Sequence, residues 1–561
     1  MPGLQGENFI LSVGSFVLML HSHLPFYRKA GMWPFGEESF YECMMETYIP
    51  LLNMVSELWD EGIPAKITIG ITPILAEQMA DDHLKHGFNK YVESRIDSAK
   101  LDEARFGPRG EQPDADRFQL SRFYLHWFQK IHNDFNNKWG RDIVAGFRKF
   151  QDLGAIEVTT SAATHGFSPL LSTDASLNCQ YKVGVESYKK HFGREPRGFW
   201  LPECAYRPSN KERAGIEKWL YKNGLKYFFT ESDVIKGGQT AEVRRVFGAY
   251  GTIEYIPAAS RKPTGLDTFE AYWLKEYPVA VMGRHEEAGY QVWSADQGYP
   301  GDGNYREFHK KDDKSGLHYW RLTSKETDLG FKQLYNPEAA MERIKENSDH
   351  YVGLVQQLLT DHLKSTNTTG LILASFDTEL FGHWWFEGIT WIKEVIRKLR
   401  TYTAVQIQTA SEYLETVPPS KAIELPESSW GAGGHFQVWY NNQTEWMWPI
   451  IHECEQAMQA AENKHRGSGA LTERALNQAL RELLLLQSSD WPFLITTGQA
   501  WQYAKDRFNE HVDRFRALIS MLDSGGVDEG KLSEIEAIDN CFPNISHTWF
   551  TAGEREPQPV P

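Results

Sequence analysis

Seven short apolar runs recur between residues 16 and 376, and several of them are followed directly by polar residues. The runs are 16–20, 65–71, 156–160, 197–201, 227–230, 278–282 and 370–376. Helical patterns separate several of them, as at 40–59. Strands that alternate with helices predict a parallel sheet or barrel, in which functional side chains follow the carboxyl ends of the strands.

Two stretches interrupt this rhythm. Residues 75–152 are charge-rich and helical in pattern, without a strand-like run, and predict a helical insertion. Residues 231–277 are rich in glycine and aromatic residues with weak periodicity, and predict a long lid-like loop region.

The character of the chain changes after Pro418 and Pro419. Apolar positions with i, i+3, i+4 spacing then predict long helices, among them 475–487 and 501–522. We therefore expect a catalytic domain over 1–417 and a helical domain over 418–561.

Composition narrows the possible partners. The chain has 561 residues and a net charge of −16, with 41% hydrophobic and 24% charged residues, as is typical of a globular protein. Nucleic acids and anionic membranes attract clustered Lys and Arg, so we expect neither as a partner. Aromatic residues make up 13% of the chain, including 19 Trp, and flat indole rings suit stacking on sugars as well as core packing.

The cysteines and the amino-terminal sequence bear on the compartment. Five cysteines without a CxxC pair fit a reducing environment. The apolar run 9–20 has no preceding Lys or Arg and no cleavage-site pattern, and it is too short to span a bilayer. We expect a buried strand there, a cytoplasmic protein and a monomer.

Two carboxylates follow predicted strands. Glu203 comes just after the run 197–201, and Asp377 just after 370–376. Acids at strand ends of one barrel can converge across its mouth. Glycosidic bond cleavage needs such a pair, one ionised and one protonated. A single acid at a strand end is more often a helix cap or an ion-pair partner.

Three histidines occupy similar positions. His21 and His23 follow the first run, and His165 follows the third. Three histidines at a barrel mouth can bind zinc, as a metal-dependent deacetylase or amidohydrolase would require. Neutral imidazoles can equally hydrogen-bond sugar hydroxyls. The pattern alone leaves both interpretations open.

Four motifs resemble, in order, the first four signature regions of glycoside hydrolase family 57. They are HSHLP at 21–25, ATHGF at 163–167, WLPECAY at 200–206 and FDTELFGHWW at 376–385. Three further segments resemble the helical domain of the branching enzymes in that family: SWGAGG at 429–434, TEW at 444–446 and LLLLQSSDW at 483–491. The resemblance extends over nearly the whole chain.

The resemblance implies a fold and a mechanism. The implied fold is an incomplete (β/α)7 barrel with a helical insertion and an all-helical C-terminal domain. The implied reaction is a retaining double displacement without metal or organic cofactor, with Glu203 as nucleophile and Asp377 as general acid/base. His21, His23 and His165 then become sugar-binding residues around the reacting carbon.

The same resemblance implies residues that position the substrate, with the helical domain forming one wall of the cleft. Arg284, Gly301, Trp430 and Asp490 occupy positions where similar branching enzymes contact glucan. Further stacking platforms are expected at Trp293, Trp439 and Trp33.

The implied activity is the cleavage of an α-1,4-glucan and its transfer to a 6-hydroxyl, which forms an α-1,6 branch. Transfer requires that water be excluded, and a lid bearing Tyr250, or alternatively Tyr255, is expected to do so. Residues 251–277 look expanded relative to the family, which leaves the balance between transfer and hydrolysis open. The alternatives are an α-amylase-type hydrolase, a 4-α-glucanotransferase, a non-catalytic glucan-binding protein and a metal-dependent polysaccharide deacetylase.

Overall fold

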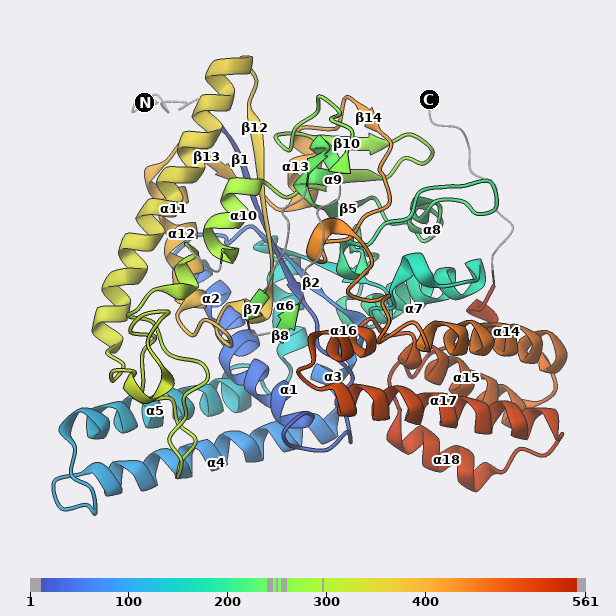
Figure 1. The fold of residues 1–561 in the computed structure, drawn as a ribbon, viewed down its shortest axis with the longest axis horizontal. Coiled ribbons are helices and arrows are strands. Elements are labelled where there is room, and N and C mark those ends of the chain that lie inside the picture. Colours follow the sequence, from blue (N-terminus) through green and yellow to red (C-terminus); the bar gives the residue numbers. More distant parts are fainter. Residues whose placement is uncertain (1–11, 240–245, 249–250, 254–259, 295–296, 552–561) are drawn as a thin grey trace, which may run out of the picture.

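The computed structural model describes residues 12–239, 246–248, 251–253, 260–294 and 297–551. Its centre is a curled, mostly parallel sheet with helices packed around it (Figure 1). The helical pair α4 (Asp82–Phe106) and α5 (Ala115–Asn133) lies below the sheet on one side, and a helical bundle lies on the other. The molecule therefore has a central layered body with a helical lobe at each side.

Seven neighbouring strands run parallel, in the spatial order β12, β1, β2, β3, β4, β5, β11. Each coincides with one of the seven predicted apolar runs: β1 Gly14–Ser22, β2 Ile67–Ile71, β3 Ile156–Ser161, β4 Gly198–Trp200, β5 Tyr227–Thr230, β11 Ala280–Gly283 and β12 Gly370–Asp377. Across the gap between β11 and β12, His285 N donates to Leu373 O at 2.8 Å, but no ladder joins these strands within the described residues. The predicted incomplete (β/α)7 barrel is confirmed.

Helices cover the sheet and fill the interval between β2 and β3. The long helices of that interval begin at aspartate caps, because Asp81 accepts from Leu84 N and Asp114 from Arg117 N, each at 3.0 Å. The remaining helices up to residue 416 are α1 Glu37–Cys43, α2 Ile49–Asp60, α3 Pro73–Ala80, α6 Ile143–Asp152, α7 Asp174–Phe192, α8 Ile216–Lys222, α9 Ser232–Lys236, α10 Glu286–Trp293, α11 Pro337–Thr366, α12 Gly388–Tyr402 and α13 Ala410–Thr416.

The segment predicted as a long loop, 231–277, contains α9 and several short strands: β6 Gly238–Gln239, β7 Val246–Gly248, β8 Gly251–Ile253, β9 Ser260–Arg261 and β10 Ala271–Leu274. Strands of two to four residues are too short to produce a readable period, which is why the pattern did not reveal them. β10 pairs antiparallel with β11, and β14 (Ala422–Ile423) extends this edge, while β13 (Val405–Ile407) pairs with β1.

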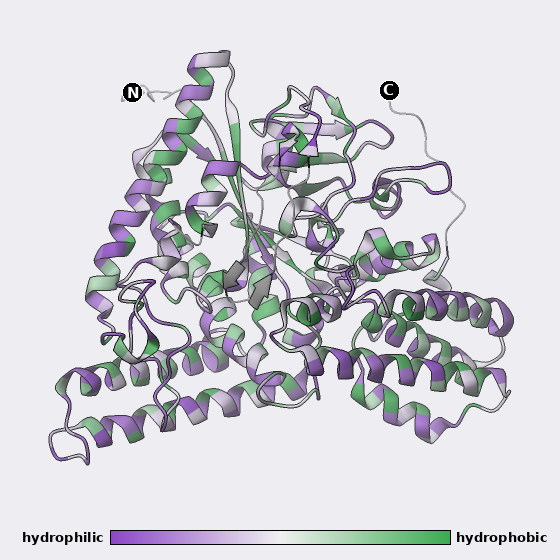
Figure 2. Ribbon diagram, viewed as in Figure 1, coloured by the Kyte–Doolittle hydropathy of each residue, from purple (hydrophilic) through white to green (hydrophobic). Residues whose placement is uncertain are grey.

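Five helices form the C-terminal bundle: α14 Met447–His465, α15 Ala470–Leu486, α16 Asp490–Thr497, α17 Trp501–Asp523 and α18 Glu529–Ile538. The two helices predicted at 475–487 and 501–522 are confirmed as α15 and α17. Hydrophobic and hydrophilic residues alternate along these helices (Figure 2), and the hydrophobic ones form a buried core. The bundle core continues into the barrel through Phe26 and Phe167, so the barrel and the bundle share one apolar cluster.

All five cysteines are buried free thiols. Among the helices that the structure describes, none combines the length and the apolarity needed to cross a bilayer.

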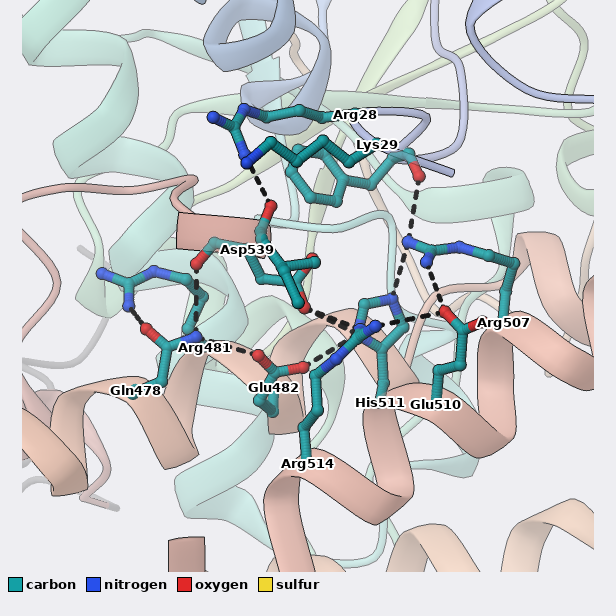
Figure 3. A network of polar contacts seen from close by, with 12 residues as sticks. Arg28, Lys29, Gln478, Arg481, Glu482, Arg507, Glu510, His511, Arg514 and Asp539 are labelled. Atoms are coloured by element: carbon teal, nitrogen blue, oxygen red, sulfur yellow. Dashed lines mark hydrogen bonds and ion pairs between the residues drawn. The ribbon is translucent and has the colours of Figure 1, made fainter. Parts of the chain in front are cut away.

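A buried polar network fastens the bundle (Figure 3). His511 Nδ1 on α17 lies 2.8 Å from Glu482 Oε2 on α15 and 3.6 Å from Asp539 Oδ2, which follows α18. Arg514 Nη1 donates to Asp539 Oδ2 at 2.8 Å. Arg28, from the segment after β1, donates to the carbonyls of Ala537 and Ile538 at 2.7 Å. The network thus joins three bundle segments to each other and to the barrel.

Two arginines on α17 offer a matched test of this network. Arg514→Ala removes the cation beside the fully buried Asp539 carboxylate, and we expect a loss of about 3–5 kcal/mol in the free energy of unfolding. Arg516→Ala breaks an exposed ion pair with Glu453 and should cost less than about 1 kcal/mol. Denaturant titration followed by circular dichroism compares the two. Equal losses would contradict the assigned role of the network.

Candidate active site

The carboxyl ends of five strands converge on one cluster of polar side chains. The residues there are His21 in β1, His165 after β3, Glu203 after β4, Arg284 after β11 and Asp377 at the end of β12. Because parallel strands end at the same rim of the sheet, residues far apart in sequence meet here. His21 and Asp377 are direct partners in the β1–β12 register.

Glu203 has an unusual backbone. It lies in the short 3₁₀ turn Pro202–Cys204 with φ 61° and ψ 24°, and Cys204 also has a positive φ of 48°. Left-handed conformations are uncommon for residues other than glycine and persist where the surroundings enforce them. Here Trp430 N donates to Glu203 O at 2.9 Å, and Pro202 begins the turn. The strand end is therefore bent so that the carboxylate faces the cluster.

Two side chains from outside the barrel hold the Glu203 carboxylate. Trp430 Nε1 donates to Oε2 at 2.8 Å, and Ser489 Oγ donates to Oε1 at 2.8 Å. Both donors favour the ionised form, because a carboxylate accepts more strongly than a neutral acid. Burial and the charge of Asp490 act in the opposite direction, and on balance the pKa of Glu203 is raised.

Three histidines form a stacked column beside Glu203. The ring centroids of His23 and His165 are 4.0 Å apart, those of His21 and His165 are 5.1 Å apart, and His21 stacks on Trp200 at 4.6 Å. His165 Nε2 lies 3.1 Å from His21 Nε2, and its Nδ1 lies 2.9 Å from Ser489 Oγ. The column thus links the end of β1 to the hydroxyl that binds Glu203.

Protonation differs along this column. Burial and the neighbouring histidines hold the pKa of His21 and of His165 well below the usual value, so both rings are neutral. His23 is different: burial opposes its charge, but the Asp490 carboxylate, 3.0 Å from His23 Nε2, raises its pKa. The site therefore combines two neutral imidazoles with one cation-prone imidazole.

Burial also shapes the acids. It raises the pKa of Asp377 well above the usual range, and the charges of Glu379 and Glu203 add to the effect while Arg284 opposes it. Burial raises the pKa of Glu379 to about 7, although the hydroxyl of Tyr48 donates to this carboxyl. Asp377 therefore keeps its proton near neutral pH, and Glu379 is partly protonated there, whereas Glu203 accepts two hydrogen bonds.

Arg284 lies beside Asp377 and is anchored by a second acid. Its Nη2 donates to Glu231 Oε2 at 2.7 Å, and its Nη1 donates to Ser375 O at 3.4 Å. Ser375 belongs to β12, two residues before Asp377. The guanidinium is therefore fixed between the ends of β5, β11 and β12.

The structure brings together the predicted Glu203, Asp377, Arg284, Trp430, Asp490 and all three histidines. The surroundings of the other predicted residues differ. Trp439 is 1% exposed and stacks on Phe167 in the bundle core at 4.7 Å, so its faces offer no surface to a sugar. Trp293, at the end of α10, is half-buried against the barrel core. Gly301 lies in the turn Tyr299–Gly301, where an added Cβ would be 2.9 Å from Lys325 Cε.

Trp33 is 77% exposed beside α1. The lid candidates Tyr250 and Tyr255 lie outside the described residues.

Several participants were missed from sequence. Ser489, Glu379, Tyr48 and Glu231 contact the cluster, yet none was singled out. Glu379 and Ser489 are close in sequence to Asp377 and Asp490, which is the signal that could have found them. Tyr48 and Glu231 lie outside the quoted motifs, and their contacts depend on the folded chain.

Comparisons with known proteins agree with this geometry. The model of glycosyl hydrolase family 57 matches residues 17–426, and the model described as "1,4-alpha-glucan branching enzyme, C-terminal" matches residues 450–550. The chain is 44% identical over 543 residues to the 1,4-alpha-glucan branching enzyme TK1436 of Thermococcus kodakarensis, covering 94% of this chain and 77% of that one.

Solved structures give the same picture. The chain is similar to the structure of the Thermococcus kodakaraensis enzyme, with a TM-score of 0.87, 42% identity and coverage of 97% and 98% of the two chains. It is also similar to a branching enzyme of family 57 from Pyrococcus horikoshii, with a TM-score of 0.86, 39% identity and coverage of 98% of each chain. The similarity to the alpha-amylase AmyC of Thermotoga maritima has a TM-score of 0.82 and 30% identity, and it covers 97% of this chain and 100% of that one.

The hydroxyl of Ser489 can be tested by its effect on Glu203. Ser489→Ala removes a donor to the ionised carboxylate, so the pKa of Glu203 should rise further. We expect the acidic limb of the pH–activity profile to move to higher pH by about one unit. Ser489→Thr, which keeps a hydroxyl, should restore the limb. An unchanged limb in the alanine variant would refute the interaction.

Proposed function

The chain belongs to glycosyl hydrolase family 57, and on that premise we propose that it is a 1,4-α-glucan branching enzyme. It cleaves an α-1,4-glucan and transfers the released chain to a 6-hydroxyl, which creates an α-1,6 branch. Its substrate is an α-glucan polymer such as amylose, glycogen or starch.

One observation carries this proposal. The Glu203 carboxylate accepts hydrogen bonds from Trp430 and from Ser489, and Ser489 belongs to the region that matches the branching-enzyme C-terminal model. The helical domain therefore acts on the reacting carboxylate as well as on stability. A chain that shared only the barrel with its relatives would lack this contact.

The first half-reaction uses the two acids in different protonation states. The Glu203 carboxylate attacks the anomeric carbon, while Asp377 gives its proton to the departing 4-oxygen. The C–O bond to the leaving chain breaks as the glycosyl ester forms. Hydrogen bonds from Trp430 and Ser489 support an ionised Glu203, and burial supports a protonated Asp377.

The second half-reaction reverses the roles. Asp377, now ionised, takes the proton of an acceptor 6-hydroxyl as that oxygen attacks the anomeric carbon. Glu203 is released as a carboxylate, and two inversions give net retention. If water replaces the acceptor, the same steps give hydrolysis.

Neutral histidines suit the binding of the sugar ring. Both ring nitrogens of His165 are engaged by His21 and Ser489, whereas His21 Nδ1 has no hydrogen-bond partner among the described residues and can bind a sugar hydroxyl. The low pKa values keep both rings uncharged. Arg284, anchored by Glu231, lies where it can donate to a hydroxyl near the cleaved bond. These assignments require no metal or organic cofactor.

The proposal includes a lid that covers the cluster and excludes water during transfer. The strand β8 lies against α16, the helix that begins at Asp490 (Figure 1). This hairpin segment therefore reaches from the barrel to the helical domain beside the site. Tyr250 stands between β7 and β8 in sequence, and we assign it the exclusion of water during transfer.

The main alternative is an α-amylase-type hydrolase, because the Thermotoga maritima alpha-amylase shares this fold at 30% identity. Both activities would use Glu203 and Asp377, and they differ in the acceptor. The match of residues 450–550 to the branching-enzyme model favours transfer.

The cellular setting is proposed as well. Five free, buried cysteines are compatible with a reducing cytoplasm, where glucan storage polymers are accessible. We propose that the enzyme acts there as a monomer.

Proton NMR on amylose incubated with the protein and a chelator tests the function. We expect many new α-1,6 linkages and few new reducing ends. Glu203→Gln should abolish all chain cleavage, because an amide cannot form the glycosyl ester, whereas Glu427→Gln, at an exposed site nearby in the fold, should be unaffected. Reducing ends without branches would assign hydrolysis instead, and normal turnover by Glu203→Gln would refute the nucleophile.

The lid assignment gives a separate expectation. Tyr250→Ala should lower the branching rate by about tenfold or more while hydrolysis falls less, because water gains access to the glycosyl ester. The ratio of α-1,6 linkages to reducing ends measures the change, with Tyr255→Ala as the comparison. An equal fall in both products would remove Tyr250 from the transfer step.

A further inference from the structure

The two acids of the site are held in different ways. Glu203 accepts hydrogen bonds from two side chains, whereas among the described residues none donates to the carboxyl of Asp377. Asp377 is the last residue of β12, and the segment 378–385, which we call the acid loop, follows it directly. The position of this carboxyl therefore depends on the backbone of β12 and of the acid loop.

A π-helical turn, Met44–Tyr48, lies between α1 and α2 and is bound to the acid loop. Thr47 in this turn is fully buried. Its Oγ1 donates to Phe381 O at 3.0 Å and accepts from His383 N at 3.1 Å, so one hydroxyl fixes the main chain of the loop at two points. Single π-helical turns of this kind are found frequently at functional sites.

The residues on either side of Thr47 bind side chains of the same loop. Glu46 Oε2 accepts from His383 Nδ1 at 3.0 Å. The hydroxyl of Tyr48 donates to the carboxyl of Glu379. Three consecutive residues of the π-helical turn thus hold both the backbone and the side chains of the acid loop.

The acid loop approaches the π-helical turn too closely for a side chain at Gly382. This glycine has a φ of 101°, which residues with a Cβ rarely adopt, and an added Cβ would collide with Glu46 O. Gly382 N donates to Trp385 O at 2.7 Å, which closes the loop on itself. The turn and the loop are therefore in backbone contact as well as joined by side chains.

Glu46 is itself anchored through its second carboxylate oxygen. Its Oε1 lies 2.8 Å from Arg306 Nη2, and Arg306 N donates to Glu387 Oε1 at 3.0 Å. Burial opposes the ionisation of Glu46, but Arg306 and His383 outweigh burial and lower the pKa of this carboxyl to about 2. Glu46 is therefore an ionised acceptor near neutral pH, and its bond to the acid loop is charge-assisted.

We propose that the π-helical turn positions the acid loop for proton transfer by Asp377. Its positioning residues are Glu46, Thr47 and Tyr48. They act through the loop, because in the described part of the chain none of them is hydrogen-bonded to Glu203 or Asp377. This role rests on the proposed function only for what Asp377 does, and it is the same whether water or a 6-hydroxyl accepts the chain.

A defect confined to proton transfer allows a selective test. Cleavage of glucan needs a proton on the departing 4-oxygen, which Asp377 supplies. α-Maltosyl fluoride needs no such proton, because its C–F bond breaks with release of fluoride as Glu203 forms the glycosyl ester. Azide then attacks the anomeric carbon without losing a proton, which gives a glycosyl azide and frees the Glu203 carboxylate. The reaction of the fluoride with azide therefore bypasses Asp377.

Two variants of the π-helical turn and one matched control form the test. Thr47→Val removes both hydroxyl bonds and keeps the shape of the side chain, while Tyr48→Phe removes one bond. Thr444→Val is the control, because Thr444 is also fully buried, donates to Trp439 O at 3.0 Å and accepts from Asn441 N at 3.1 Å. Amylose cleavage is counted as new reducing ends plus new α-1,6 linkages, and thermal unfolding shows whether each variant is folded.

For Thr47→Val we expect kcat for amylose cleavage to fall about 10- to 100-fold, with KM changed by less than about twofold, because a displaced acid slows the chemistry but leaves binding intact. Tyr48→Phe should lose about three- to tenfold. Rates with α-maltosyl fluoride and azide should stay within about twofold of the parent rate for both variants. Thr444→Val should leave the ratio of the two rates unchanged.

Asp377→Ala is the benchmark and should show the same selective loss. If it does and neither turn variant does, the positioning role is overturned and the proposed function stands. Equal loss of both reactions in folded turn variants would also overturn the positioning role, because a merely structural contact gives that result. If Asp377→Ala loses both reactions equally, the assignment of Asp377 in the proposed function fails, and the positioning role fails with it.

Discussion

Two hydrogen bonds, from Trp430 and Ser489 to the Glu203 carboxylate, are the constraint on which the site depends. The barrel supplies the strand end that carries Glu203, but it does not orient that carboxylate by itself. The orientation comes from segments that follow the barrel in sequence and that pack on it through a shared apolar core. Docking of the helical domain and formation of the site are therefore the same event, and the buried network around His511 contributes to both.

Docking of the helical domain also excludes water from the site. Burial is the largest influence on the pKa of Glu203, Asp377, His21 and His165 alike, and it favours the neutral form of each. Local hydrogen bonds and neighbouring charges then make the pKa values of these groups differ, although burial favours the neutral form of each. Glu203 has two donors, whereas Asp377 faces two other acids, so the two carboxyls are set apart for different tasks.

Sequence patterns could predict the parallel strands, because a strand buried on both faces is a continuous apolar run, as at 16–20 in β1. They could also place polar residues at strand ends. They could not reveal that Ser489 reaches Glu203, because no local pattern encodes a contact across 286 positions. Trp439 was wrong as a stacking platform because an indole packs equally well in a core or on a sugar, and burial decides between them.

The separation of 286 residues between Glu203 and Ser489 has a consequence during synthesis. At roughly 5–20 residues per second, a ribosome needs roughly 15–60 s to travel from one codon to the other. Throughout that interval the barrel can begin to fold, yet its key carboxylate has no partner from the helical domain. The Glu203 carboxylate therefore acquires both of its side-chain hydrogen-bond donors only after the last quarter of the chain has emerged and docked.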